Sequence, residues 1–219
     1  GAAVIRRDLA GIPDVVEIPS FEEVSEDSRA GRLAFARAFR RYIENCDPDR
    51  GRPVAQKTGD RYVVVYPPQP EPTVEEIDAL YSLPFARIPH PAYSSMGGVP
   101  AWETVRDSIT IHRGCFGDCS FCAIAAHQGR RIVSRSHDSI LAEIERVASS
   151  PSFRGTISDL GGPTANMYGL GCRKGRYRCP GRSCLVPEIC PNLETDHASY
   201  SALLRAAGRI HGVKHVFVG

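Results

Sequence analysis

The sequence lacks long apolar runs and carries little net charge. No window approaches the roughly 18 consecutive apolar residues that a membrane-spanning helix needs, which excludes such a helix. The N-terminus has no basic-then-apolar stretch typical of a secretory signal, so we expect a cytoplasmic protein with no membrane partner. Lys and Arg number 27 against 25 Asp and Glu. The net charge of +2 therefore gives the whole chain no electrostatic footprint for nucleic acid.

The size and apolar content of the chain are those of a globular protein. The apolar residues make up 42% of 219, which argues against a disordered or fibrous chain and allows one domain plus part of another. Because the first residue is Gly and not Met, we expect the chain to be processed or to lie within a longer one.

Cysteine is the informative residue type. Seven of the 8 cysteines lie between Cys115 and Cys190, and only Cys46 lies outside. Without a secretory signal, such clustering favours metal ligation over a disulfide framework.

The first hundred residues are expected to form an α+β supporting part. Apolar residues at helical spacing predict a helix over residues 33–43. Apolar runs at residue 54 and at 62–66, separated by Gly59 and Asp60, predict a hairpin. Thr73 is predicted to cap the next helix, with Glu76 as its capping-box partner.

From about residue 104, strands and helices alternate. The pattern predicts strands at 108–112, 155–160 and 213–218, a helix around 140–147, and a second helix over 200–210 that Gly212 ends. This order implies parallel pairing with right-handed crossovers. Three strands are too few to close a barrel, so we predict a truncated α/β barrel.

The sharpest motif is Cys115-x3-Cys119-x2-Cys122, directly after the first of these strands. Cysteine thiolates are soft ligands suited to iron–sulfur clusters or zinc, and Gly114 and Gly117 permit a tight loop around one centre. This motif, with the aromatic Phe121 before its last cysteine, resembles that of the radical S-adenosylmethionine (SAM) enzymes. Further stretches resemble the uncharacterised YgiQ-type branch: Leu83–Arg87, His90–Tyr93, Arg113–Cys122, His127–Arg130, Ser134–Ser136 and Asp159–Tyr168.

The resemblance implies a fold, two cofactors and a reaction. Residues 1–103 would be the C-terminal part of an N-terminal extension, and residues 104–219 the first three strands of a six-stranded core. The three cysteines would bind a 4Fe-4S cluster whose fourth iron chelates S-adenosylmethionine. An electron donor would reduce the cluster, and the resulting 5′-deoxyadenosyl radical would take a hydrogen atom from a substrate. Since later core strands would be missing, we expect this fragment to hold a cluster but turn over poorly.

The resemblance also points to contacts for S-adenosylmethionine. Besides Phe121, these are Gly161, Gly162, Pro163 and Thr164, where the family usually carries a Gly-Gly-Glu-Pro segment for the methionine amino group. No Glu stands here, although the two glycine carbonyls could accept from that amine. Turn chemistry alone is the alternative explanation for a glycine-rich strand end. No catalytic residue or substrate is identified, and His112 in the preceding strand is expected to pack in the core.

A second cysteine set lies in a Gly- and Pro-rich loop over residues 172–190. Its spacing fits neither a zinc ribbon nor a ferredoxin run, so a second 4Fe-4S cluster, a structural zinc and free or disulfide-bonded thiols all remain open. The interleaved basic residues favour a solvated loop that offsets thiolate charge over a nucleic-acid patch. The alternative function is a non-catalytic zinc module that binds nucleic acid or protein. The four cysteines are Cys172, Cys179, Cys184 and Cys190.

Overall fold

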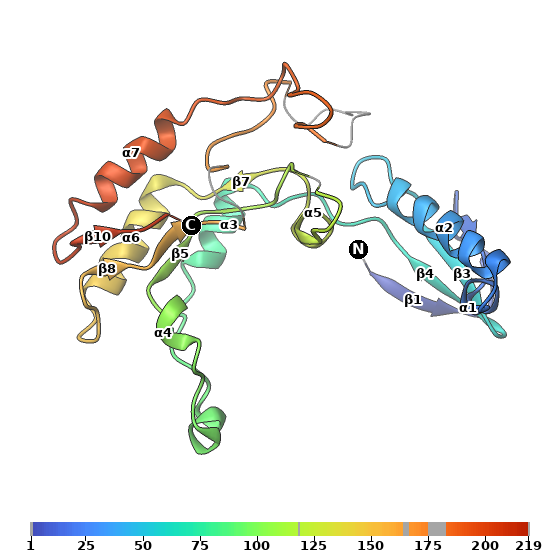
Figure 1. Ribbon diagram of the computed structural model, residues 1–219, viewed down its shortest axis with the longest axis horizontal. Coiled ribbons are helices and arrows are strands. Elements are labelled where there is room, and N and C mark those ends of the chain that lie inside the picture. The colour runs from blue at the N-terminus through green and yellow to red at the C-terminus, as the bar shows by residue number, and fades with distance from the viewer. Residues whose placement is uncertain (1, 118, 164–166, 175–182, 219) are drawn as a thin grey trace. The chain divides into compact units, whose positions relative to one another are not determined.

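The structure is a computed structural model that describes residues 2–117, 119–163, 167–174 and 183–218 (Figure 1). The chain is mixed α/β and divides into two compact units, Gly1–Pro70 and Glu71–Gly219. The predicted boundary between residues 103 and 104 separates an extension from a family core on sequence grounds, and it stays a prediction.

The first unit is built on a four-stranded sheet in the order β1-β4-β3-β2. The predicted hairpin is confirmed, because β3 and β4 pair antiparallel around Gly59, whose φ of 59° suits glycine. Strand β1 pairs antiparallel with β4, and β2 pairs parallel with β3. The strands are β1 (Ala3–Arg6), β2 (Val16–Ile18), β3 (Val54–Thr58) and β4 (Arg61–Val65).

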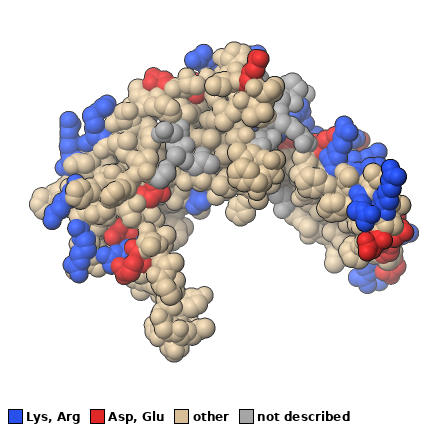
Figure 2. All heavy atoms as spheres, viewed as in Figure 1, with Lys and Arg blue, Asp and Glu red and all other residues tan. Residues whose placement is uncertain are grey.

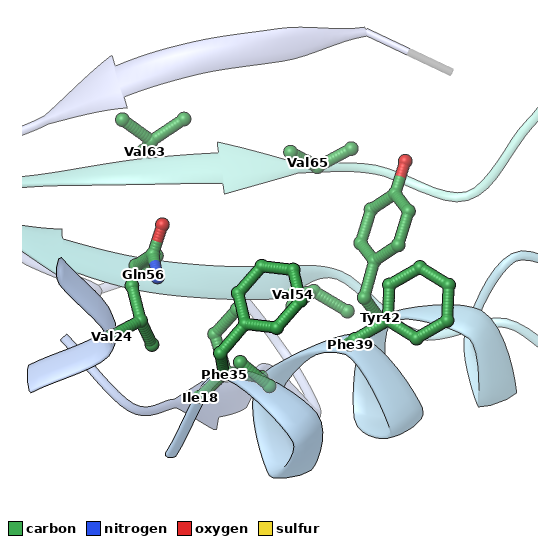
Figure 3. A pocket seen from close by; sticks show the side chains of 10 residues that line it. Ile18, Val24, Phe35, Phe39, Tyr42, Val54, Gln56, Val63 and Val65 are labelled. Atoms are coloured by element: carbon green, nitrogen blue, oxygen red, sulfur yellow. The ribbon is translucent and has the colours of Figure 1, made fainter. Parts of the chain in front are cut away.

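Two helices of this unit, α1 (Phe21–Ser25) and α2 (Arg29–Glu44), follow β2. The second contains the predicted helix of residues 33–43. A groove of about 280 Å³ opens between α2 and the strands. Phe35, Phe39 and Tyr42 point from α2 toward β3 and β4 (Figure 3). Figure 2 shows basic side chains at the surface of this unit, where α2 alone carries five arginines.

The second unit holds three parallel strand segments, as predicted. Strand β5 pairs parallel with β9, and β8 pairs parallel with β10. A further hydrogen bond from the Leu160 N–H to the Phe217 carbonyl, 2.8 Å, continues the second pairing into β9. The strands are β5 (Ser108–Thr110), β6 (His112–Arg113), β7 (Val133–Ser134), β8 (Thr156–Ile157), β9 (Asp159–Gly161) and β10 (His215–Val216).

The three predicted helices of this unit are present, one with a different end, and η1, α4 and α5 were not predicted. Ser136 caps α6, and Thr73 and Glu76 form the predicted capping box at α3. Helix α7 ends at Ala207, because Gly208 costs helical stability at the next position, and not at Gly212 as predicted. The helical segments are α3 (Val74–Tyr81), the 3-10 helix η1 (Pro91–Met96), α4 (Trp102–Val105), α5 (Ile124–Gln128), α6 (His137–Ala148) and α7 (Ala198–Ala207).

The core of the second unit lies between the strands and helices α6 and α7. Ile109 and Ile111 from the first strand segment and Leu160 from β9 pack with Ile144 of α6 and Leu203 of α7. Since side chains alternate between the two faces of a strand, the residues between these apolar ones face away from the helices.

A buried hydroxyl ties α7 to β9. The Tyr200 hydroxyl donates to the Leu160 carbonyl over 2.6 Å, and burial raises the pKa of Tyr200 to about 12. We expect Tyr200→Phe to lower the free energy of unfolding by about 1 kcal/mol at neutral pH. A phenol whose folded-state pKa is raised stabilises fully below pH 10 and loses that contribution as the pH rises toward 12. Denaturant titrations should therefore show that the free energy of unfolding falls more between pH 10 and pH 12 in wild type than in the variant. An equal fall in both proteins would contradict this.

A buried ion pair joins Arg135, the residue directly after β7, to α6. The Arg135 side chain is fully buried and donates to Glu143 over 2.6 Å and to the Thr110 carbonyl over 2.8 Å. Its guanidinium lies 4.1 Å from the centre of the Tyr81 ring. Arg87 binds the other oxygen of Glu143. The Glu143 carboxylate therefore provides the counter-charge for two arginines from separate segments.

Candidate metal and cofactor site

The loop of Cys115, Cys119 and Cys122 begins where β6 ends. The Cys115 side chain is buried, and its backbone N–H donates to the Gly129 carbonyl over 3.1 Å. A Cβ placed on Gly117 would lie 3.3 Å from the Cys115 sulfur and 3.6 Å from the Cys119 sulfur. Two of the three sulfurs therefore lie on the same side of Gly117, where a larger residue would crowd them.

Gly114 allows this loop to leave the strand. Its φ is +87°, and a Cβ at this position would lie 1.8 Å from the Arg131 carbonyl oxygen. A side chain here would meet both a left-handed backbone and a fixed carbonyl. The predicted conformational role of Gly114 is thus supported by the geometry.

Cys122 is the third cysteine of the motif, but in the structure its sulfur does not lie with those of Cys115 and Cys119 around one centre. The Cys122 N–H donates to the Cys119 carbonyl over 3.0 Å in a turn, and the neighbouring Phe121 is 91% exposed. Within the described ranges, no three His, Cys, Asp or Glu side chains are close enough to hold a metal ion. None of the seven described cysteines forms a disulfide.

These residues suit an iron–sulfur cluster by their donor chemistry. Three soft thiols share one short loop, and two of their sulfurs lie beside Gly117. Asp118, within the same loop, lies outside the described residues.

The glycine segment predicted to contact S-adenosylmethionine lies next to this loop's strand. Gly161 ends β9 opposite Thr110, and its carbonyl accepts from the Ile111 N–H over 2.8 Å. That carbonyl is therefore already engaged by the sheet, whereas Gly162 and Pro163 follow the strand end. Thr164 lies outside the described residues.

Each of the two glycines leaves room for a polar side chain. A Cβ on Gly161 would lie 2.6 Å from an Asp159 carboxylate oxygen, and one on Gly162 would lie 2.2 Å from the His112 ring. The strand pairing thus brings a carboxylate and an imidazole to the end of the sheet from which the cysteine loop departs. Alternation along the strand places His112 on the opposite side from Ile109 and Ile111. The sequence could therefore have indicated that His112 faces the candidate site, but we expected it to pack in the core.

Two of the three described cysteines of the second set lie against the first loop. Phe116 of the first loop is buried with Leu170 and Leu193, and partly buried Cys184 and Cys190 pack on this cluster. The hydroxyl of Ser183 donates to the Gly117 carbonyl over 3.4 Å.

Within the second loop, backbone contacts hold the cysteines. The Cys190 N–H donates to the Cys184 carbonyl over 2.8 Å, and Cys172 forms an isolated bridge with Leu193. Cys179 lies outside the described residues. The sequence did not indicate that the two cysteine loops pack together.

Comparison with known proteins supports one family. The family described as "Radical SAM N-terminal" matches residues 2–108. A UPF0313 protein of Methanocella arvoryzae is 47% identical over 221 residues, covering all of this chain and 36% of its own length. UPF0313 proteins of Clostridium botulinum and Rhodopseudomonas palustris are each 44% identical over the whole chain.

The chain spans about a third of the length of the curated relatives it matches. Among the described helices, none combines the length and apolar character needed to cross a membrane. The matched family and the relatives agree with the resemblance of the cysteine motif. The chain therefore belongs to the radical S-adenosylmethionine superfamily, in its UPF0313, YgiQ-type family.

Proposed function

We propose that this chain carries the cluster-binding part of a radical S-adenosylmethionine enzyme. The observation that supports this most directly is the loop of Cys115, Cys119 and Cys122, which leaves the carboxyl end of paired parallel strands with two sulfurs beside Gly117. Loops at the carboxyl ends of parallel strands are where α/β folds place their ligands.

The chain's residues would hold and shield the cofactors. With one electron from a donor, the cluster and S-adenosylmethionine supply homolytic cleavage of the sulfur–C5′ bond, giving methionine and a 5′-deoxyadenosyl radical that takes a hydrogen atom from the substrate. The three cysteines would ligate the cluster. Phe116, 8% exposed, and the residues packed on it would exclude water from one side of the loop. Phe121, Gly161, Gly162, Pro163 and Thr164 are our candidates for contacting S-adenosylmethionine.

The three parallel strand segments would form the first part of a radical SAM barrel. The remaining strands would lie in the portion of the relatives that this chain does not span. We therefore expect the isolated chain to retain a cluster but to form little 5′-deoxyadenosine. The substrate class and the electron donor would be determined by that remaining portion.

We also propose a second metal site at Cys172, Cys179, Cys184 and Cys190. Its support is the packing of Cys184 and Cys190 against the first loop, which would place two cysteine-ligated centres in one region. Folding such an irregular loop around a metal would offset its small apolar core.

The test is a count of iron, acid-labile sulfide and zinc per chain after anaerobic reconstitution. We expect about four irons with matching sulfide if only the first set binds a cluster, and about eight if both sets do. Cys115→Ala should remove about four of them, because a cluster with two protein ligands is poorly held. Cys184→Ala should remove the metal of the second set and leave most of the iron of the first.

Cys46→Ala is the matched control. Cys46 lies in the first unit, just after α2, and its substitution should leave the metal content unchanged. Zinc without sulfide that persists in Cys115→Ala would overturn the proposal and favour a zinc-binding module.

A further inference from the structure

His112 is a buried imidazole without a hydrogen-bond partner among the described residues. The residue is 1% exposed, and neither Nδ1 nor Nε2 has a partner there. A polar group that is buried without a partner lowers the stability of the fold, so most such groups are paired. Two ring nitrogens without a hydrogen-bond partner indicate that a bound ligand supplies the partner.

Strand geometry places His112 on the side of the sheet away from helices α6 and α7. Ile109 and Ile111, its neighbours in alternation, pack into the helix-covered core. Thr110 and His112 therefore face the opposite side. Asp159 and Gly161 share that side on β9, because Leu160 between them is in the same core.

The ring of His112 lies directly against Gly162. The imidazole Cε1, Nδ1 and Nε2 atoms would be 2.2, 2.4 and 2.5 Å from a Cβ on Gly162. The polar end of the ring therefore reaches the strand end of β9, while its own backbone lies three residues before Cys115. The imidazole spans the space between the two segments assigned to cofactor binding.

The imidazole is neutral in this environment. Burial is the main cause, with the neighbouring Arg113 second, and together they lower the pKa of His112 to about 4. A neutral imidazole offers one N–H donor and one nitrogen acceptor. A ligand group that combines an ammonium with a carboxylate can satisfy both.

We propose that His112 is a positioning residue that hydrogen-bonds the amino-acid end of S-adenosylmethionine between the cysteine loop and Gly162. This inference rests on the proposed function. No glutamate directly follows Gly161 and Gly162 in the sequence. His112, whose ring lies against Gly162, would supply a polar contact there. Gly162 would be required because a side chain there would displace the ring.

The experiment measures binding of labelled S-adenosylmethionine to the full-length protein with its cluster, by equilibrium dialysis without reductant. We expect His112→Phe to raise Kd roughly 10- to 100-fold, since a hydrogen bond to a charged group contributes about 1.5 to 3 kcal/mol. His112→Gln, which keeps a donor and an acceptor, should recover most of the affinity. Iron content should match wild type in both variants.

The outcomes separate the inference from the proposed function. Wild-type protein that holds a cluster but no S-adenosylmethionine would overturn the proposed function itself. Wild-type affinity in His112→Phe, with normal binding otherwise, would overturn only the role of His112.

A second measurement, made on wild type, tests the inference even if His112→Phe loses its iron or does not fold. The imidazole ¹⁵N shifts of His112 in wild type, assigned with His112→Gln, should change when S-adenosylmethionine is added. Unchanged shifts at saturating ligand would overturn the inference.

Discussion

Replacing Glu143 by alanine is expected to lower the free energy of unfolding by about 3 to 5 kcal/mol. The carboxylate binds Arg135, whose side chain is fully buried, and Arg87, which is 31% exposed. Removing it leaves a buried guanidinium without a counter-charge and a second one nearby. Urea unfolding of this chain, followed by circular dichroism, measures the change.

Glu145→Ala is the matched control for this prediction. Glu145 lies on the same helix α6 but is exposed, and its substitution should change the free energy of unfolding by less than about 0.5 kcal/mol. Similar losses in the two variants would show that helix propensity, and not the buried ion pair, determines the result.

Gly114→Ala is expected to destabilise the chain by about 3 kcal/mol and to reduce the iron bound by the first cysteine loop. Its methyl group would need the Arg131 carbonyl to move, because the two atoms would otherwise lie 1.8 Å apart. Overpacking of this kind costs about 1 to 3 kcal/mol, and the left-handed backbone adds to it. Denaturant unfolding and iron analysis of the reconstituted protein check both effects.

Gly97→Ala separates the two causes. Gly97 has nearly the same φ, +88°, but no atom lies within 4 Å of a Cβ built there. Its substitution should therefore cost only the backbone term, about 1 kcal/mol, and leave the iron content unchanged. Equal effects at both positions would show that the contact with Arg131 carries no cost.

The packing between the two cysteine loops has a consequence for how metal would be bound. Phe116 joins the first loop to Leu170 and Leu193, and Cys190 packs on the same cluster. Ordering either loop buries surface of the other. Metal bound at one set should therefore favour the conformation that the other set needs.

Local signals in the sequence were sufficient for most elements of the second unit. The capping box of Thr73 and Glu76 marks a helix start that the structure confirms. The parallel pairing followed from the strand–helix alternation alone. The end of α7 was misplaced because Gly208 ends the helix before Gly212 is reached.

The candidate site was only partly predictable. The spacing of Cys115, Cys119 and Cys122 is local, so one sequence suffices to identify the motif. The position of Gly162 against His112 depends on the register between β5 and β9, which joins residues some fifty apart. No local pattern reports such a contact.

The sequence by itself determined the family, the cysteine motif and the alternation of strands and helices after residue 104, because each depends on short-range spacing or periodicity. Only the tertiary structure decided that Glu143 pairs with two arginines, that the two cysteine loops share one apolar cluster, and that His112 is buried without a partner among the described residues. These features depend on side chains brought together from distant segments, whose burial and pairing are fixed by packing.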